Sequence, residues 1–213
     1  MSGLYPIIDV DSLAALKLPV LDYAQAILQL RPKLVQLRAK HLSARETLEL
    51  LRALRPLCPP GETLLFANDR PDLAVLADCD GVHVGQDDLP VQAVRQFAPT
   101  LQVGVSTHSF DQLDAALAAR PDYVAFGPIF VTESKARPHP VVGVPALAEA
   151  ARRAHAQGAG IVAIGGINAG NAAELAGLPV FAAVIAALLP PDGDLESVAE
   201  RARALQASLQ GTA

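Results

Sequence analysis

This chain of 213 residues has few cysteines, a small net charge and no long apolar run. Its two cysteines, Cys58 and Cys79, are too few for a disulfide framework and lack the close spacing of metal ligands, which indicates a reducing compartment. With 22 acidic and 17 basic residues, the net charge of -5 argues against the broad basic field of a nucleic-acid-binding protein. The longest apolar run, from Leu178 to Leu189, is too short for a membrane span and contains Pro179.

The chain is rich in apolar residues. With 51% hydrophobic and 18% charged residues, it is long enough for one well-buried domain, and no low-complexity linker divides residues 1–213. Its first residues carry no basic region, long apolar region or cleavage pattern of a secretory leader. We therefore expect a single-domain cytoplasmic protein that binds neither membrane nor nucleic acid.

Short apolar runs alternate with longer segments of helical spacing from end to end. Parallel strands need a crossover of a dozen or more residues, so this order predicts parallel pairing. Eight such units predict a small closed (β/α)8 barrel, a TIM barrel with short loops. An open doubly wound sheet is the alternative, but no Gly-x-Gly-x-x-Gly follows the first strand. The expected strands are Leu4–Asp9, Leu34–Leu37, Thr63–Phe66, Gly81–Val84, Gln102–Val105, Tyr123–Phe126, Gly160–Ile164 and Val180–Val184.

Two of the expected helices carry a start signal. Ser43 with Glu46, and Ser109 with Gln112, have the spacing by which a side chain and a backbone N–H satisfy each other at a helix start. Further helical patterns begin near Pro71 and Val144 and follow the last strand.

If the barrel forms, the polar residues at the carboxyl ends of its strands converge on one face, where barrel enzymes keep their chemistry. Asp69 follows the third strand, and Asp87 and Asp88 follow the fourth. Two such carboxylates raise each other's pKa unless cations such as Lys40 or a divalent metal relieve the repulsion. Oxygen ligands of this kind suit Mg²⁺. If only one of these acids were present, a helix cap ahead of Pro71 would be the more typical interpretation. The presence of both favours a metal site.

Basic and polar groups lie beside these acids. Gln36, Arg38 and Lys40 alternate at period 2, which places three polar groups on one side of a strand and its exit. A solvated lysine and an ordinary ion pair are the alternatives. After the seventh strand, Gly165-Gly166 and a helix expected near Asn168 resemble a phosphate cradle, although a double glycine also suits a tight turn.

Five blocks of the sequence resemble, in order and spacing, the motifs of the thiamine-phosphate synthase (thiamin phosphate pyrophosphorylase) family. They are VQLRAK, ANDRPDLAVLADCDGVHVGQDDLP, GVSTHS, YVAFGPIFVTESK and IVAIGGI, and they span most of the chain. The resemblance implies a barrel enzyme that joins 4-amino-5-hydroxymethyl-2-methylpyrimidine diphosphate to 4-methyl-5-(2-phosphoethyl)thiazole with Mg²⁺. The products would be thiamine phosphate and pyrophosphate.

The resemblance also implies roles for individual residues. Asp69 and Asp88 would bind the metal, and Arg38, Lys40 and Lys135 would stabilise the leaving group. The pyrimidine diphosphate would be held by Gln36, Arg38, Lys40, Asn68, Ser106 and Lys135. The thiazole phosphate would be held by Thr132, Ser134, Gly166, Ile185 and Ala186. We also infer that the loop from Gly127 to Gly143, which carries Lys135, closes over the substrates to exclude water.

The chain departs from the family pattern at a few positions. Ala186 stands where a serine is expected, so a hydroxyl contact to the thiazole phosphate is missing, while Ser134 and Ala39 are milder changes. One rival is the thiazole tautomerase of the same superfamily, in which His108 would be the acid and base. Another is a phosphate-binding barrel without catalysis. The retained diphosphate and metal residues favour the synthase; a homodimer is compatible with the sequence.

Overall fold

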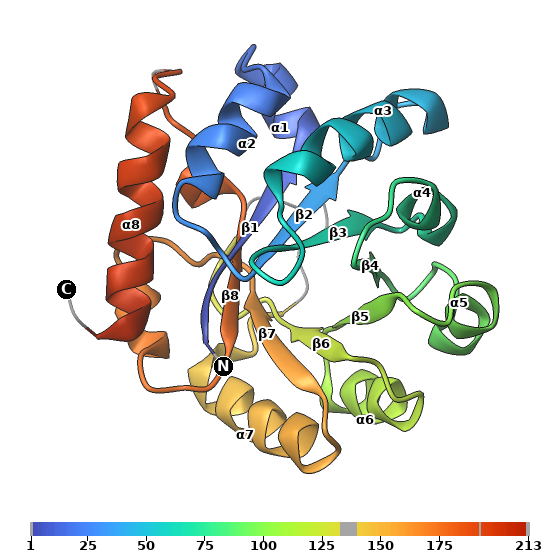
Figure 1. The fold of residues 1–213 in the computed structure, drawn as a ribbon. Coiled ribbons are helices and arrows are strands. Elements are labelled where there is room, and N and C mark those ends of the chain that lie inside the picture. Colours follow the sequence, from blue (N-terminus) through green and yellow to red (C-terminus); the bar gives the residue numbers. More distant parts are fainter. Residues whose placement is uncertain (1, 133–139, 192, 212–213) are drawn as a thin grey trace.

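The computed structural model describes residues 2–132, 140–191 and 193–211. Its strands run parallel and close in sequence order, with β1 paired to both β2 and β8, so the barrel prediction is confirmed and the open sheet is wrong (Figure 1). The strands are β1 (Gly3–Asp9), β2 (Leu34–Arg38), β3 (Leu64–Asn68), β4 (Gly81–Val84), β5 (Gln102–Thr107), β6 (Tyr123–Phe126), β7 (Gly160–Ile164) and β8 (Phe181–Val184).

Helices surround the barrel on the outside (Figure 1). They are α1 (Val10–Ala15), α2 (Val20–Leu28), α3 (Ala44–Leu54), α4 (Pro71–Leu76), α5 (Val91–Phe97), α6 (Phe110–Ala118), α7 (Gly143–Ala156) and α8 (Glu196–Gln210). The described part of the chain also has the short 3-10 helices η1 (Arg55–Leu57), η2 (Ala172–Leu175) and η3 (Ala186–Leu188). None of the described helices is long and apolar enough to cross a membrane.

Both predicted helix starts are confirmed. Ser43 and Glu46 form a complete capping box at α3, in which each side chain bonds to the other residue's backbone N–H. At α6, the Ser109 hydroxyl accepts from the Gln112 N–H, but the Gln112 side chain accepts from the His108 N–H instead. This second bond ties the end of β5 to the helix that follows it.

The α-helix expected near Asn168 is absent, and that prediction is wrong. Residues 168–171 form a turn held by amide side chains, followed only by η2. Asn168 Oδ1 accepts from the Gly170 N–H, and Asn171 Oδ1 accepts from the Asn168 N–H. Because asparagine side chains offer the backbone these local partners, they compete with helix formation.

Several strand ends also differ from prediction. β3 runs to Asn68 and β5 runs to Thr107, whereas the predicted strands stop at Phe66 and Val105. Asn68 is in register with His83, and Ser106 with Ala125, so these polar residues remain in the ladder. The strands therefore carry polar side chains up to the barrel mouth.

The core consists of two layers, one inside the barrel and one between barrel and helices. The inner layer includes Tyr5, Ile7, Leu34, Phe66, Tyr123, Ala125, Val162 and Ala183. Two glycines make room for its rings. A Cβ at Gly104 would lie 2.0 Å from Cζ of Tyr123, and a Cβ at Gly81 would lie 2.3 Å from a ring carbon of Phe66. Only glycine allows aromatic rings to fill the barrel at these positions.

Candidate active site

The carboxyl ends of all eight strands open on one face, the barrel mouth, because the strands are parallel. Polar residues expected there lie on neighbouring strand ends. Arg38 ends β2, Asn68 ends β3, and Ser106 is the next-to-last residue of β5. All three are half-buried, whereas Gln36, two residues before the end of β2, is buried.

Asp69, Asp88 and Lys40 form a charged cluster at this mouth. Lys40 Nζ lies 2.5 Å from Asp69 Oδ2, and the Asp88 carboxyl is close enough to Asp69 to raise the pKa of that residue. The Gly85 N–H donates to Asp88 Oδ2 at 2.7 Å, which fixes that side chain. The structure thus brings together the two acids that the sequence predicts to act as a pair.

Burial raises the pKa of Asp69, and the neighbouring Asp88 raises it further, although the Lys40 ammonium opposes both effects. Because the pKa is raised in the folded protein, Asp69 lowers folding stability as the pH rises above the unfolded value of about 3.9, and this cost is complete above the folded value. A cation held between Asp69 and Asp88 would offset this cost.

Asp69 does not cap the helix that follows it, so the alternative interpretation of this segment is not supported. The residue before α4 is Arg70, and its side chain forms no capping hydrogen bond. Asp69 instead has a positive φ of 63°, and its N–H donates to the carbonyl of His83 on β4 at 2.8 Å. A non-glycine residue in this region is uncommon, and here the backbone bond to β4 holds it over the mouth.

The two carboxylates fit Mg²⁺. This ion takes one or two protein carboxylates and completes its shell with water and substrate phosphate. Within the described ranges, no group of three or more His, Cys, Asp or Glu side chains could hold a metal by itself. The donor set of Asp69 and Asp88 therefore matches an ion that a diphosphate helps to bind, and does not match a closed structural site.

Arg38 has a partner that the sequence did not reveal. Its guanidinium forms an ion pair with Asp9, the last residue of β1, and lies 3.9 Å from Asp11. Burial opposes ionisation of Asp9, but hydrogen bonds from Ser12 and Arg38 outweigh it and hold the pKa of Asp9 below its usual value. The Asp9 side chain is 4% exposed, so this carboxylate is a fixed support for Arg38.

A chain of hydrogen bonds crosses the barrel beneath the mouth. Gln36 Nε2 donates to the Tyr5 hydroxyl at 2.9 Å, and the Tyr5 and Tyr123 hydroxyls are 3.0 Å apart. The Tyr123 hydroxyl lies 2.9 Å from Nδ1 of His83, and His83 Nε2 lies 2.8 Å from the Ser106 hydroxyl. The members of this chain come from β1, β2, β4, β5 and β6, so no single stretch of the sequence reveals it.

The double glycine after β7 joins two loops. A Cβ at Gly166 would lie 2.3 Å from the carbonyl oxygen of Val131, and Gly166 has a φ of 69° that favours glycine. The Phe130 N–H donates to the Gly165 carbonyl at 3.0 Å. This contact places the segment that leads into Thr132 against Gly166, so two of the predicted thiazole-phosphate residues come from adjoining loops.

The remaining predicted residues lie as follows. Ile185 and Ala186 follow β8, and Ala186 is exposed. Ser134 and Lys135 lie outside the described residues. His108 would be the acid and base of the alternative enzyme, the thiazole tautomerase. Its Nδ1 atom lies 2.7 Å from the carbonyl oxygen of Gly127. That bond uses one ring nitrogen of His108 to hold the start of the loop after β6.

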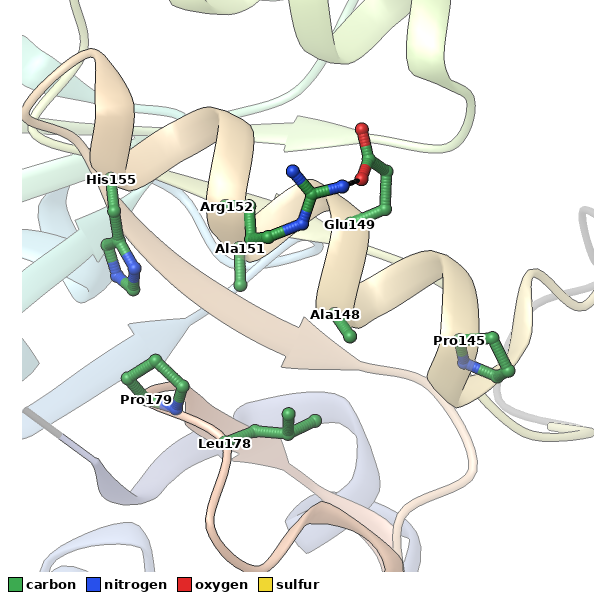
Figure 2. A pocket seen from close by; sticks show the side chains of 8 residues that line it. All are labelled: Pro145, Ala148, Glu149, Ala151, Arg152, His155, Leu178 and Pro179. Carbon is green, nitrogen blue, oxygen red and sulfur yellow. Dashed lines mark hydrogen bonds and ion pairs between the residues drawn. The ribbon is translucent and has the colours of Figure 1, made fainter.

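A second hollow, a groove along α7, is separate from these residues. Figure 2 shows side chains of the helix facing Leu178 and Pro179 on the segment before β8. Arg152 pairs with Glu149 on the same helix. The groove is lined by Pro145, Ala148, Glu149, Ala151, Arg152, His155, Leu178 and Pro179. None of the predicted site residues that the structure describes lines this groove.

Fold and site together define a (β/α)8-barrel enzyme with a charged mouth suited to phosphorylated substrates. A family model described as thiamine monophosphate synthase matches residues 4–188. The chain therefore belongs to the thiamine-phosphate synthase family, whose curated members are transferases.

Individual relatives agree with this assignment. The chain is 42% identical to a thiamine-phosphate synthase of Anaeromyxobacter dehalogenans over 96% of this chain and 87% of the relative. It is 41% identical to one of Chlorobium luteolum over 90% of this chain and 88% of the relative. A solved thiamine phosphate pyrophosphorylase from Pyrococcus furiosus superposes with a TM-score of 0.81 at 30% identity, covering 99% of this chain and 96% of that one.

Proposed function

We propose that residues 1–213 form one cytoplasmic catalytic domain that couples 4-amino-5-hydroxymethyl-2-methylpyrimidine diphosphate to 4-methyl-5-(2-phosphoethyl)thiazole. The products are thiamine phosphate and pyrophosphate. The observation that carries the proposal is the cluster of Asp69, Asp88 and Lys40 at the mouth of a barrel of this family. Nucleic acid and membrane have no part in it, and a homodimer is compatible with it.

The reaction begins with departure of the diphosphate. Positive charge develops on the pyrimidine methylene, and negative charge gathers on the leaving group. Arg38, supported by Asp9, and Lys40, supported by Asp69, supply cationic groups that are already in place before this charge develops. Pre-placed charge of this kind is commonly the largest contribution to catalysis. Lys135 adds to this group by the family resemblance.

Asp69 and Asp88 hold Mg²⁺ in this proposal. When bound, the ion supplies further positive charge to the diphosphate oxygens. Gln36 of β2, Asn68 of β3 and Ser106 of β5 complete the pyrimidine-diphosphate site. No protein nucleophile is needed, because the thiazole nitrogen attacks the pyrimidine methylene directly.

The second substrate is held by the loops after β6, β7 and β8. Thr132 and Ser134 come from the first loop, Gly166 from the second, and Ile185 and Ala186 from the third. The close contact between Gly166 and residues 130–131 supports a joint site for one phosphate. Holding two substrates in register is the protein's other contribution to the rate.

The experiment compares two variants that the rival functions rank in opposite order. Lys40→Met removes the cation beside Asp69, whereas His108→Asn keeps a group able to donate to the Gly127 carbonyl. We expect Lys40→Met to lower kcat/KM for pyrophosphate release by about 100-fold or more, since a pre-placed charge is lost. His108→Asn should stay near wild type. The opposite ranking, measured together with thiazole tautomerisation, would favour the tautomerase.

A further inference from the structure

The buried chain from Gln36 to Ser106 runs between two residues of the proposed pyrimidine-diphosphate site. Its middle members, Tyr5, Tyr123 and His83, are almost fully buried, with exposed fractions of 1%, 6% and 8%. Gly104 lies where a Cβ would collide with the Tyr123 ring. The barrel is therefore built to hold these hydroxyls in line, and simple packing would not need their oxygens.

The direction of the chain follows from counting hydrogens. Burial raises the pKa of Tyr5 to about 12, and burial together with Tyr5 raises that of Tyr123 well above its usual value. Each phenol therefore carries one hydrogen to donate. Tyr5 already accepts from Gln36 Nε2, so its own hydrogen goes to Tyr123. Tyr123 then donates to Nδ1 of His83, and His83 donates from Nε2 to the Ser106 hydroxyl.

The reverse direction does not satisfy every group. If His83 donated to Tyr123 and Tyr123 donated to Tyr5, the Tyr5 hydroxyl would accept from both Gln36 and Tyr123. Its own hydrogen would then lack an acceptor in the chain. A buried hydroxyl hydrogen without an acceptor is unfavourable, which favours the first direction. Only rotation of the Gln36 amide would make the reverse direction complete.

We propose that Tyr5 and Tyr123 are positioning residues that fix the polarity of the pyrimidine site. Because Nε2 of Gln36 is committed to Tyr5, the amide presents its oxygen, a hydrogen-bond acceptor, to the substrate. Ser106 accepts from His83 and so turns its own hydrogen, a donor, to the substrate. This inference rests on the proposed function and concerns which pyrimidine ring the site binds. That ring carries an amino group to donate, and an oxo-pyrimidine, with a carbonyl in place of the amino group, is rejected.

The test compares the 4-amino pyrimidine diphosphate with its 4-oxo analogue. Binding of each is measured by calorimetry, and kcat/KM is measured with the thiazole phosphate. The variants are Tyr5→Phe and Tyr123→Phe. Tyr23→Phe is the matched control, because Tyr23 is fully buried and its hydroxyl, alone among buried side-chain polar atoms of the described residues, has no hydrogen-bond partner.

We expect the wild type and Tyr23→Phe to prefer the amino compound. Tyr5→Phe and Tyr123→Phe should each lower the amino-to-oxo ratio by about tenfold or more, because Gln36 is then free to rotate and present its NH₂. A merely structural role would weaken both compounds equally and leave the ratio unchanged, which would overturn the proposal. Wild-type preference for the oxo compound would overturn it as well.

Binding separates this inference from the proposed function. Tight, selective binding of the amino compound without turnover would contradict the synthase function and still support the polarity. The enzyme could turn over the substrates while neither phenylalanine variant changes the preference for the amino over the oxo compound. That result would support the synthase function and contradict the proposed role of Tyr5 and Tyr123.

Discussion

Asp9→Asn tests how the charged mouth is held. The substitution keeps an oxygen that can accept from Ser12 at the start of α1, but it removes the charge that pairs with Arg38. Arg38 is then left with Asp11, at 3.9 Å, as its remaining carboxylate. The change therefore separates the support of Arg38 from the capping of the helix.

The expected size follows from the burial of the pair. The Asp9 side chain is 4% exposed and the Arg38 side chain is 31% exposed, so solvent screens the pair only in part. A hydrogen bond to a charged group contributes about 1.5–3 kcal/mol, and we take about 2 kcal/mol for this pair. For a chain of this length that corresponds to a fall in Tm of about 4–8 °C. Displacement of Arg38 should also lower kcat/KM by about tenfold, mainly through KM for the pyrimidine diphosphate.

The contribution of Asp9 to folding stability depends on pH in a direction that can be predicted. Because the pKa of Asp9 is lowered in the folded protein, its contribution is complete above the unfolded value of about 3.9 and is lost as the pH falls through the folded value. Urea unfolding of wild type and Asp9→Asn should therefore differ at pH 7, and the difference should shrink as the pH falls from about 4 through the folded pKa of Asp9. Asp111→Asn, at an exposed position in the first turn of α6, is the control. Equal stability and equal KM at pH 7 would refute the reasoning.

Three further predictions concern the metal and the second phosphate. Asp88→Asn should raise the Mg²⁺ concentration needed for half-maximal activity by about tenfold or more, while its exposed neighbour Asp87→Asn should not; equal shifts in a magnesium titration would count against the metal site. Gly166→Ala puts a Cβ 2.3 Å from the Val131 carbonyl at a positive φ, so both Tm and thiazole-phosphate affinity should fall, and unchanged steady-state KM would contradict the joint loop site. Ala186→Ser should lower the KM for thiazole phosphate several-fold, with the KM for pyrimidine diphosphate unchanged; a higher KM for thiazole phosphate would argue against a phosphate at this position.

The barrel could be predicted from the sequence because each apolar run is short and each connection has helical spacing. The errors fall where polar side chains replace the apolar signal. Asn68 and Thr107 extend their strands beyond the apolar runs, since the ladder partners on neighbouring strands decide where a strand ends. After β7, the amides of Asn168 and Asn171 bond to the local backbone, and the pattern of glycine and apolar residues does not show this.

The site was predictable only in part, for a related reason. The position of a residue at a strand end shows that it reaches the mouth, which is enough for Asp69, Asp88 and Lys40. It does not show which side chains meet. Asp9 supports Arg38 because β1 and β2 pair in a register that places these residues opposite each other. Tyr5 reaches Tyr123 only because the sheet closes, and no local pattern carries that information.

The measurement that tests the central claim most directly is product formation from the two proposed substrates by purified protein. Thiamine phosphate and pyrophosphate are quantified together, with and without Mg²⁺, in the wild type and in Asp88→Asn. We predict that the products appear in equal amounts, only with Mg²⁺, and that the variant loses most of the activity. Absence of thiamine phosphate at saturating concentrations of both substrates with Mg²⁺ would contradict it.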